Sequence, residues 1–442
     1  MLLFLYLEEV FGLIKSLWEH QIGLKNYVHA RYKKQPSSNV LCISPTGSGK
    51  STIAAIIAQK FKNTLIISHR IELINQMRIE FEKHNVKNYL ITTPSKALCV
   101  FHKYFDSLII DEAQRSCALT YKNLAFRFRN KMILGLTATP VRTDGKLLGK
   151  IYDYFIEGPQ IPDLQEIGVL SRTVDLCFPF NIDISDVPIS KITYDYEPDY
   201  LAHKMRNVKL YGEVIKEFKK NSLNRKNITY CVNIKHAMDM TEYYRNHGLN
   251  AVCVSSYTSF KDRMEIYKDF VASKIQILVN CMIYTEGINV PDVSSITSLR
   301  PTHSLGLHYQ INGRGIRHFP GKKNCLLIDH SGNIQRHGSI SDRRDWKYEI
   351  KNKKLQKKII YGEESDNPKK RNIRYKIYEA VDLDYYVNPK RKMDASMAMR
   401  IIVETNNNSK TIEEICNQYG YTLDSFILFI NKNKGYNKYY SK

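Results

Sequence analysis

The chain has 442 residues, 43% of them hydrophobic, and its 66 Lys and Arg outnumber 44 Asp and Glu to give a formal net charge of +22. This length suits two or three domains rather than one core. The charge favours a polyanionic partner, because bound phosphates release condensed counterions, although a merely Lys-rich surface would look the same. Nine scattered cysteines, none spaced as CxxC, argue against a disulfide framework or a zinc site. They favour a reduced, cytoplasmic compartment (the host cytoplasm if the source is viral).

The first residues, MLLFLYLEEVFGLI, are apolar but carry no basic lead segment, and Glu8 and Glu9 interrupt them. We expect an amphipathic helix here rather than a signal peptide, and we assign residues 1–35 to an N-terminal helical segment. No later run reaches membrane-spanning length. A soluble protein without a membrane partner is therefore predicted.

Short β-type runs then alternate with helical stretches, which is the pattern of parallel α/β sheets. Strand candidates occur at 39–44, 64–68, 89–93, 107–111 and 132–138, and again at 227–232, 250–255, 275–280, 294–299 and 324–329. The two sets predict α/β domains at residues 36–160 and 206–338. The Pro-containing stretch at 161–205 is predicted to be a linker with one extra strand at 173–178.

The composition changes after Gly338. Residues 336–442 hold 23 Lys and Arg against 14 Asp and Glu, a net charge of +9, with little β pattern. The stretch TIEEICNQYGYTLDSFILFI (411–430) indicates helix, turn and helix, so a DNA-binding helix-turn-helix and a plain helical pair packed on the main body both stay open. We predict a small, mainly helical basic domain at 339–442.

The stretch CISPTGSGKST (42–52) follows a predicted strand and precedes the helical pattern IAAIIAQKF. Glycines let the backbone N–H groups of such a loop surround phosphate oxygens at a helix N-terminus. Lys50 would reach the β- and γ-phosphates of ATP, and the Ser51 hydroxyl would coordinate Mg²⁺. Ser44 replaces the first glycine of the usual pattern. The residues expected to bind nucleotide here are Pro45, Thr46, Gly47, Ser48, Gly49, Lys50, Ser51 and Thr52.

A second chemical signal is SLIIDEAQRS (107–116), where a buried-type strand runs into two carboxylates. An acidic pair after a strand is usually a solvated turn. This pair lies a few β/α units beyond a phosphate loop, so we interpret Asp111 as a ligand of Mg²⁺ and Glu112 as the group that orients and polarises the attacking water.

In order along the chain, PTGSGKS, DEAQ, LTATP (136–140) and QINGRGIR (310–317) resemble motifs I, II, III and VI of superfamily 2 helicases. HRIELINQ (69–76), TTPSKAL (92–98) and ILVNCMIYTEGINVPDV (277–293) resemble motifs Ia, Ib and V. The resemblance covers roughly Trp18 to Gly338. It implies an α/β fold with two RecA-like parallel-sheet domains in tandem and an ATP cleft between them.

The resemblance also implies roles in the second half of the chain. Arg314 and Arg317, one helical turn apart, would both face the cleft as arginine fingers. Gln310 would help to arrange the γ-phosphate and the water. Gly287, Asn289 and Asp292 would lie where motif V touches both nucleotide and nucleic acid, with Gly287 and Asn289 binding nucleotide; Asn289 replaces the Asp common there.

Further implied roles concern coupling, base reading and nucleic acid. Thr137 and Thr139 would link the ATP state to domain closure, and Gln114, where many members have His, would relay that state toward them or toward Gln310. Gln21 resembles the glutamine that reads adenine. The expected nucleic-acid contacts are His69, Arg70, Thr93, Pro94 and Thr285.

These features predict an ATP- and Mg²⁺-dependent DNA helicase, most similar to XPB-like and phage UvsW-like enzymes. We expect a monomeric motor that unwinds or branch-migrates forked, junction or duplex DNA in replication, recombination or repair, with a single strand in its track. Two alternatives stay open. One is an RNA helicase or remodeller, since the motor motifs do not read the 2′-hydroxyl. The other is a DNA-bound motor subunit of a larger restriction or transcription complex, without unwinding activity of its own.

Overall fold

The structure is a computed structural model that describes residues 19–116, 118–140, 151–178, 182–190, 193–205, 208–283, 290–344, 346 and 376–379. The chain divides into two compact units, one of Met1–Arg344 with Lys353–Asp384 and one of Asp345–Asn352 with Tyr385–Lys442. The helix-turn-helix candidate at 411–430 and most of the predicted basic domain lie outside the described residues.

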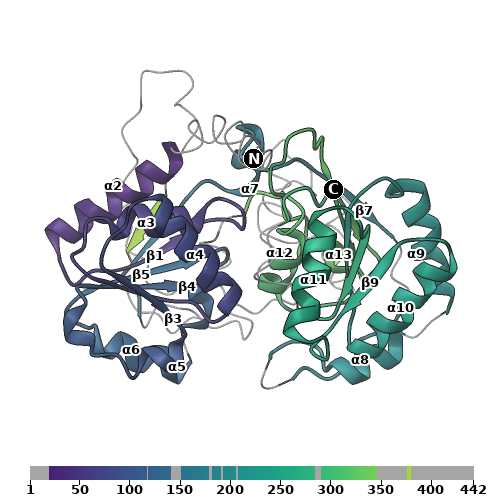
Figure 1. The fold of residues 1–442 in the computed structure, drawn as a ribbon, viewed down its shortest axis with the longest axis horizontal. Helices are drawn as coiled ribbons and strands as arrows, with labels where there is room; N and C mark the ends of the chain where they lie inside the picture. Colours follow the sequence, from purple (N-terminus) through teal and green to yellow (C-terminus); the bar gives the residue numbers. More distant parts are fainter. Residues whose placement is uncertain are drawn as a thin grey trace, which may run out of the picture. The chain divides into compact units, whose positions relative to one another are not determined.

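The first sheet has seven strands in the order β13-β6-β1-β5-β4-β2-β3 (Figure 1). Only β13 runs antiparallel to its neighbour β6; the other pairs are parallel. The strands are β1 (Asn39–Ile43), β2 (Thr64–Ile67), β3 (Tyr89–Thr92), β4 (Ser107–Asp111), β5 (Met132–Thr137), β6 (Tyr154–Glu157) and β13 (Lys376–Glu379). The helices of this part are α2 (Glu19–Lys34), α3 (Lys50–Ala58), α4 (Ile71–Lys83), α5 (Pro94–Ala97) and α6 (Leu119–Arg127), with short 3₁₀ turns η1 (His102–Tyr104) and η2 (Ala113–Arg115).

The central strands of this sheet are buried along their length, which explains their continuous apolar runs. All residues of β4 and β5 are buried, as expected for parallel strands covered on both faces. One core joins α2, α3 and α4 to alternate strand residues such as Cys42, Ile109 and Leu134. In Figure 1, α5 and α6 lie on the other side of the sheet.

The second sheet has six parallel strands in the order β7-β12-β11-β8-β10-β9. Alternation places Leu278 in one core and Ile277 and Val279 in another, so both faces are covered. The strands are β7 (Thr173–Cys177), β8 (Asn227–Tyr230), β9 (Ala251–Val254), β10 (Ile277–Asn280), β11 (Ser295–Ser298) and β12 (Cys325–Asp329). The helices are α7 (Ile161–Glu166), α8 (Pro198–Met205), α9 (Val208–Asn221), α10 (Ile234–Asn246), α11 (Phe260–Val271), α12 (Leu305–Asn312) and α13 (Asn333–His337).

The prediction of two RecA-like parallel-sheet domains is confirmed, and every strand candidate is a strand. The segment 161–205 is more than a linker, because β7 extends the second sheet beside β12 and Asp195 forms a buried ion pair with Arg300 (3.0 Å). Two strands, β6 and β13, were not predicted. None of the described helices combines the length and apolar character that crossing a membrane requires.

Candidate nucleotide-binding site

The loop between β1 and α3 depends on its glycines. Gly47 and Gly49 both have a φ of +87°, in the left-handed region that favours glycine. A Cβ on Gly49 would lie 2.3 Å from Gln21 Nε2. Ser44, at the position of the usual first glycine, donates its backbone N–H to Thr137 O (2.8 Å). The loop is therefore a tight turn at the N-terminus of α3, where backbone N–H groups can bind phosphate.

Lys50 is the first residue of α3, and its side chain turns back into the loop. The ammonium Nζ donates to the carbonyl oxygens of Ser44 (3.2 Å) and Pro45 (3.3 Å). Burial lowers the pKa of Lys50, and the nearby carboxylates of Glu112 and Asp111 oppose that effect. A partly buried ammonium on two carbonyl dipoles is suited to bind an anion such as a phosphate.

Two buried carboxylates stand at the end of β4. Asp111 is its last residue, and Glu112 follows with a φ of +50°, which is uncommon for a residue other than glycine. Ser68 Oγ donates to Asp111 Oδ2 (3.2 Å). Burial, followed by the charge of Glu112, raises the pKa of Asp111 to about 7. Adjacent buried carboxylates repel each other unless a proton or a cation joins them, so the pair fits a divalent cation.

Arg314 and Arg317 come from the second-sheet domain, Arg314 in the turn after α12 and Arg317 just beyond that turn. The expected spacing on one helix needs correction, because α12 ends at Asn312 and a tight turn follows. A Cβ on Gly313 would lie 2.8 Å from Thr46 Cβ, so glycine lets this turn approach the loop. Burial, followed by the charge of Arg314, lowers the pKa of Arg317 to about 9. The buried guanidinium of Arg314 and the partly buried one of Arg317 line the same pocket and favour an anionic ligand.

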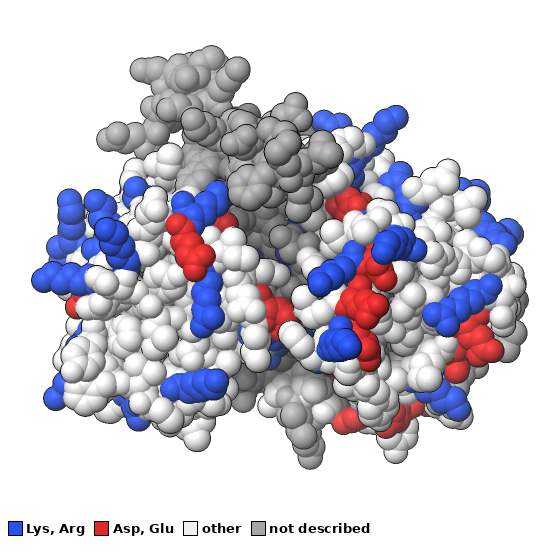
Figure 2. All heavy atoms as spheres, in the orientation of Figure 1, with Lys and Arg blue, Asp and Glu red and all other residues white. Residues whose placement is uncertain are grey.

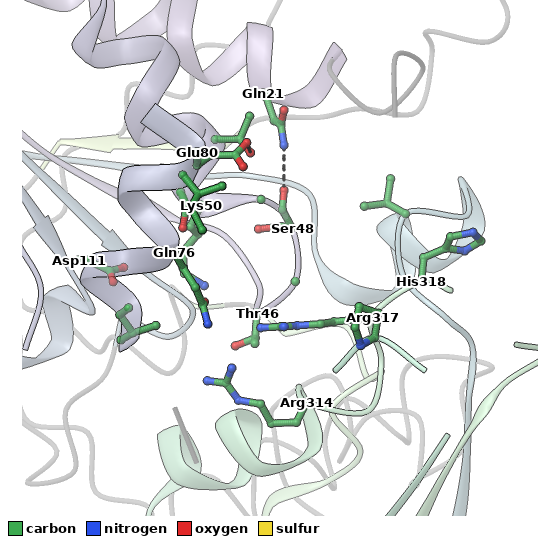
Figure 3. A pocket seen from close by; sticks show the side chains of 18 of the residues that line it. Gln21, Thr46, Ser48, Lys50, Gln76, Glu80, Asp111, Arg314, Arg317 and His318 are labelled. Atoms are coloured by element: carbon green, nitrogen blue, oxygen red, sulfur yellow. Dashed lines mark hydrogen bonds between the residues drawn. The ribbon is translucent and has the colours of Figure 1, made fainter. Parts of the chain in front are cut away.

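These groups line one pocket of about 500 Å³. Loop residues 46–52 and the two carboxylates come from the first sheet, and Arg314, Arg317 and His318 come from the second. In Figure 3 both arginines extend toward the loop at Thr46, while Lys50 and Asp111 lie across the pocket. The set fits a nucleoside triphosphate with Mg²⁺, because it offers anion-binding N–H groups, three cations and a pair of carboxylates.

Comparison with known proteins decides the family. Residues 14–97 and 91–142 match the model of the type III restriction enzyme res subunit, and residues 209–319 match that of the helicase conserved C-terminal domain. The chain is 31% identical over 334 residues to the 51.5 kDa protein of a Lactococcus phage, across 73% of this chain and 72% of the relative. It is 25% identical over 329 residues to IRC3 of Saccharomyces cerevisiae, which is assigned as an ATP-dependent helicase, across 65% of this chain and 47% of that protein.

The chain belongs to the superfamily 2 helicases. Solved structures agree at the level of the fold. A fragment of an HsdR-type subunit of a type I restriction enzyme from Vibrio vulnificus matches with a TM-score of 0.51 and 18% identity, over 68% of this chain and 61% of that one. The type ISP restriction-modification enzyme LlaBIII, bound to DNA, matches with a TM-score of 0.50 and 14% identity, over 70% of this chain and 27% of that one.

In this superfamily 2 chain, Gln21 of α2 lies against the phosphate loop. Gln21 Nε2 donates to Ser48 O (3.2 Å), and the ring of His20, which the sequence analysis missed, lies 3.1 Å from the same oxygen. Gln21 is buried, and its Oε1 has no hydrogen-bond partner among the described residues. Gln21 lines the pocket, so this amide oxygen could accept a hydrogen bond from a ligand donor such as the amino group of adenine.

Gln114 links the carboxylates to the end of β5. Its Nε2 donates to Glu112 Oε2 (2.7 Å), and its Oε1 accepts from Thr137 Oγ1 (2.8 Å). Thr137 Oγ1 in turn accepts the backbone N–H of Thr139 (3.2 Å). The three residues expected to couple nucleotide state to motion therefore form a continuous hydrogen-bonded path from Glu112.

One wall of the pocket was not predicted. Gln76, Glu80 and Lys83 of α4 line it, and Thr52 Oγ1 donates to Glu80 Oε1 (2.5 Å). Their spacing of four and three residues puts them on one helical face, a signal available in the sequence.

Several predicted residues lie elsewhere. Gln310 lies on α12 but does not line the pocket. In this part of the chain the pocket is lined by Arg314 and Arg317, which follow the helix. Asp292 forms an ion pair with Lys226. Thr285, Gly287 and Asn289 lie outside the described residues.

The other expected nucleic-acid residues gather at one edge of the first sheet. His69 and Arg70 follow β2, and Thr93 and Pro94 follow its neighbour β3, so all four lie at the carboxyl ends of adjacent parallel strands. Arg70 Nη1 donates to Ile283 O (2.6 Å), in the segment after β10 of the second sheet.

Proposed function

We propose that this chain is an ATP-driven motor that unwinds or branch-migrates forked or junction DNA in replication, recombination or repair. The observation that carries the proposal is the pocket in which Lys50, Asp111 and Glu112 of one sheet domain meet Arg314 and Arg317 of the other. A site divided in this way can couple hydrolysis to movement, because the arginines contribute only when the two domains are close.

Each residue has a task in this proposal. Lys50 and the loop N–H groups hold the phosphates, and Ser51 and Asp111 would hold Mg²⁺. When bound, Mg²⁺ neutralises charge on the phosphate oxygens. Glu112 orients and polarises the attacking water, and the arginines stabilise negative charge on the γ-phosphate, an effect worth roughly 10³–10⁵ in rate in related NTPases.

The test is ATP hydrolysis measured with single-stranded, duplex, forked and four-way DNA, with RNA of matched sequence beside them. We expect DNA to stimulate hydrolysis, branched DNA most of all, and Lys50→Ala to abolish both hydrolysis and strand displacement. Failure of every nucleic acid to stimulate the wild-type chain would overturn the motor proposal.

A second candidate is the motor subunit of a larger restriction-type complex, and the match of residues 14–142 to the res-subunit model supports it. This candidate predicts stimulation by duplex DNA without strand displacement or junction migration by the lone chain. Stimulation by RNA alone would instead favour an RNA remodeller.

A further inference from the structure

We propose that a second contact surface for single-stranded nucleic acid lies on the first-sheet domain, outside the helicase motifs. The surface, which we call the aromatic platform, consists of Phe101, Tyr104 and Phe126 with the cations Lys103 and Arg129. The inference rests on the proposed function as a nucleic-acid motor and adds the stacking of bases to it.

The rings of the platform are exposed. Phe101, Tyr104 and Phe126 are 58%, 71% and 67% exposed, whereas large aromatic side chains are mostly buried in folded proteins. The rings of Phe101 and Tyr104 are neighbours, with centroids 5.3 Å apart. Phe101 and Tyr104 form an exposed aromatic pair, and Phe126 is a third exposed ring on α6, a helix that contacts α5. Exposed aromatic side chains that gather in this way are typical of binding surfaces.

The segments that carry the platform are positively charged. Residues 94–105 and 118–131, which hold α5, the loop after it and α6, contain six Lys and Arg and no Asp or Glu. Lys103 Nζ lies 5.9 Å from the Phe101 ring centroid, and Arg129 Cζ lies 4.5 Å from that of Phe126. In Figure 2 the lower left of the molecule, over α5 and α6, shows Lys and Arg but no Asp or Glu. Cations interleaved with rings can bind phosphates and bases together.

The loop that carries two of the rings is held in place by α6 and the residues just after it. Arg127 Nη1 donates to Leu98 O (2.6 Å), and Lys131 Nζ donates to His102 O (3.0 Å). The His102 ring also lies 6.5 Å from the buried ring of Phe128. Because these contacts fix the loop, binding would cost little ordering of Phe101 and Tyr104.

The position of the platform suits a continuation of the nucleic-acid path. Thr93 and Pro94, both expected contacts, begin α5, and the loop with Phe101 and Tyr104 follows that helix directly. Helix α5 in turn contacts α6, which carries Phe126. No platform residue lines the nucleotide pocket, so substitutions there leave the hydrolytic groups in place.

The experiment measures the Kd of the full chain for a 20-nucleotide oligo(dT) and for an abasic oligomer of equal length, by fluorescence anisotropy over a range of salt. We expect the double variant Phe101→Ala, Tyr104→Ala to weaken oligo(dT) binding about tenfold or more while binding the abasic oligomer like the wild type, because stacking needs bases. The pair Lys103→Gln, Arg129→Gln should weaken both and lower the salt slope by about 1.4, the value for two lost phosphate contacts.

The matched control is Tyr200→Ala, an equally exposed aromatic (66%) on α8, which should change neither Kd. Suppose that DNA stimulates hydrolysis by the wild type but that both double variants bind oligo(dT) with the wild-type Kd. The platform is then not a nucleic-acid surface, and a protein partner remains its occupant. If the wild type itself neither binds nor is stimulated, the proposed function fails first.

Discussion

The Thr137 hydroxyl has one proton and two acceptors within reach, Gln114 Oε1 at 2.8 Å and Thr139 O at 2.6 Å. It can donate to only one of them at a time. Gln114 also donates to Glu112, so a change at this carboxylate can alter which acceptor Thr137 uses. Glutamine suits the position because it both donates and accepts without titrating near neutral pH, unlike histidine.

Gln114→Ala should therefore separate coupling from chemistry. We expect basal ATP hydrolysis to stay within a few-fold of the wild type while its stimulation by DNA falls about tenfold. Glu112→Gln should lose roughly 10²–10⁴ of basal hydrolysis, because it removes the group that polarises the water. Steady-state kinetics with and without DNA measure both effects.

Thr137→Val supplies the matched control, since it removes the other partner of the same hydrogen bond. Because both changes remove the same hydrogen bond, the double variant Gln114→Ala, Thr137→Val should lose no more of the stimulation by DNA than either single variant. Loss of basal hydrolysis in Gln114→Ala as complete as in Glu112→Gln would show that Gln114 takes part in the chemistry.

At the scale of elements, α12 and α13 hold a histidine pair, the buried His308 and the partly buried His337, with ring centroids 5.4 Å apart. Burial lowers the pKa of each to about 3; the cations Arg336 and Arg344 act in the same direction. The unfolded chain, in which histidine titrates near 6.5, therefore binds more protons between pH 3 and 6.5. The stability contributed by these neutral histidines is complete above pH 6.5 and is lost as the pH falls.

We predict that the free energy of unfolding drops by about 2 kcal/mol between pH 7 and pH 5.5 through this pair. Urea denaturation at the two pH values measures it. The double variant His308→Gln, His337→Gln should show a smaller drop, whatever its stability at pH 7. If the free energy of unfolding falls equally in the variant and the wild type between the two pH values, groups other than these histidines cause the fall.

At the scale of the whole molecule, the sequence was most informative where both faces of a strand are buried. β4 and β5 are continuous apolar runs, and the phosphate loop and the carboxylates follow strand ends, so their residue types and their order along the chain could be recognised. β6 was missed because Tyr154–Glu157 has two aromatic residues but no long apolar run, and β13 because its KIYE pattern lies in a Lys-rich stretch.

Contacts between distant residues were beyond the sequence. The polar face of α4 is seen to line the nucleotide pocket only in the folded structure. The sequence also does not show that His20 lies beside Ser48. The turn at Gly313, which carries Arg314 and leads to Arg317, depends on how closely Gly313 approaches Thr46, which no local pattern encodes. Periodicity predicts elements, but it does not predict which side chains meet across two sheets.

In the proposed function, hydrolysis requires arginines of one domain at a nucleotide held by the other. The most direct measurement compares ATP binding and DNA-stimulated hydrolysis in the wild type, Arg314→Ala and the exposed control Arg78→Ala of α4. We predict that Arg314→Ala keeps its ATP affinity within about tenfold but loses roughly 10³-fold or more in hydrolysis, while Arg78→Ala hydrolyses like the wild type. Full hydrolysis by Arg314→Ala would contradict the account.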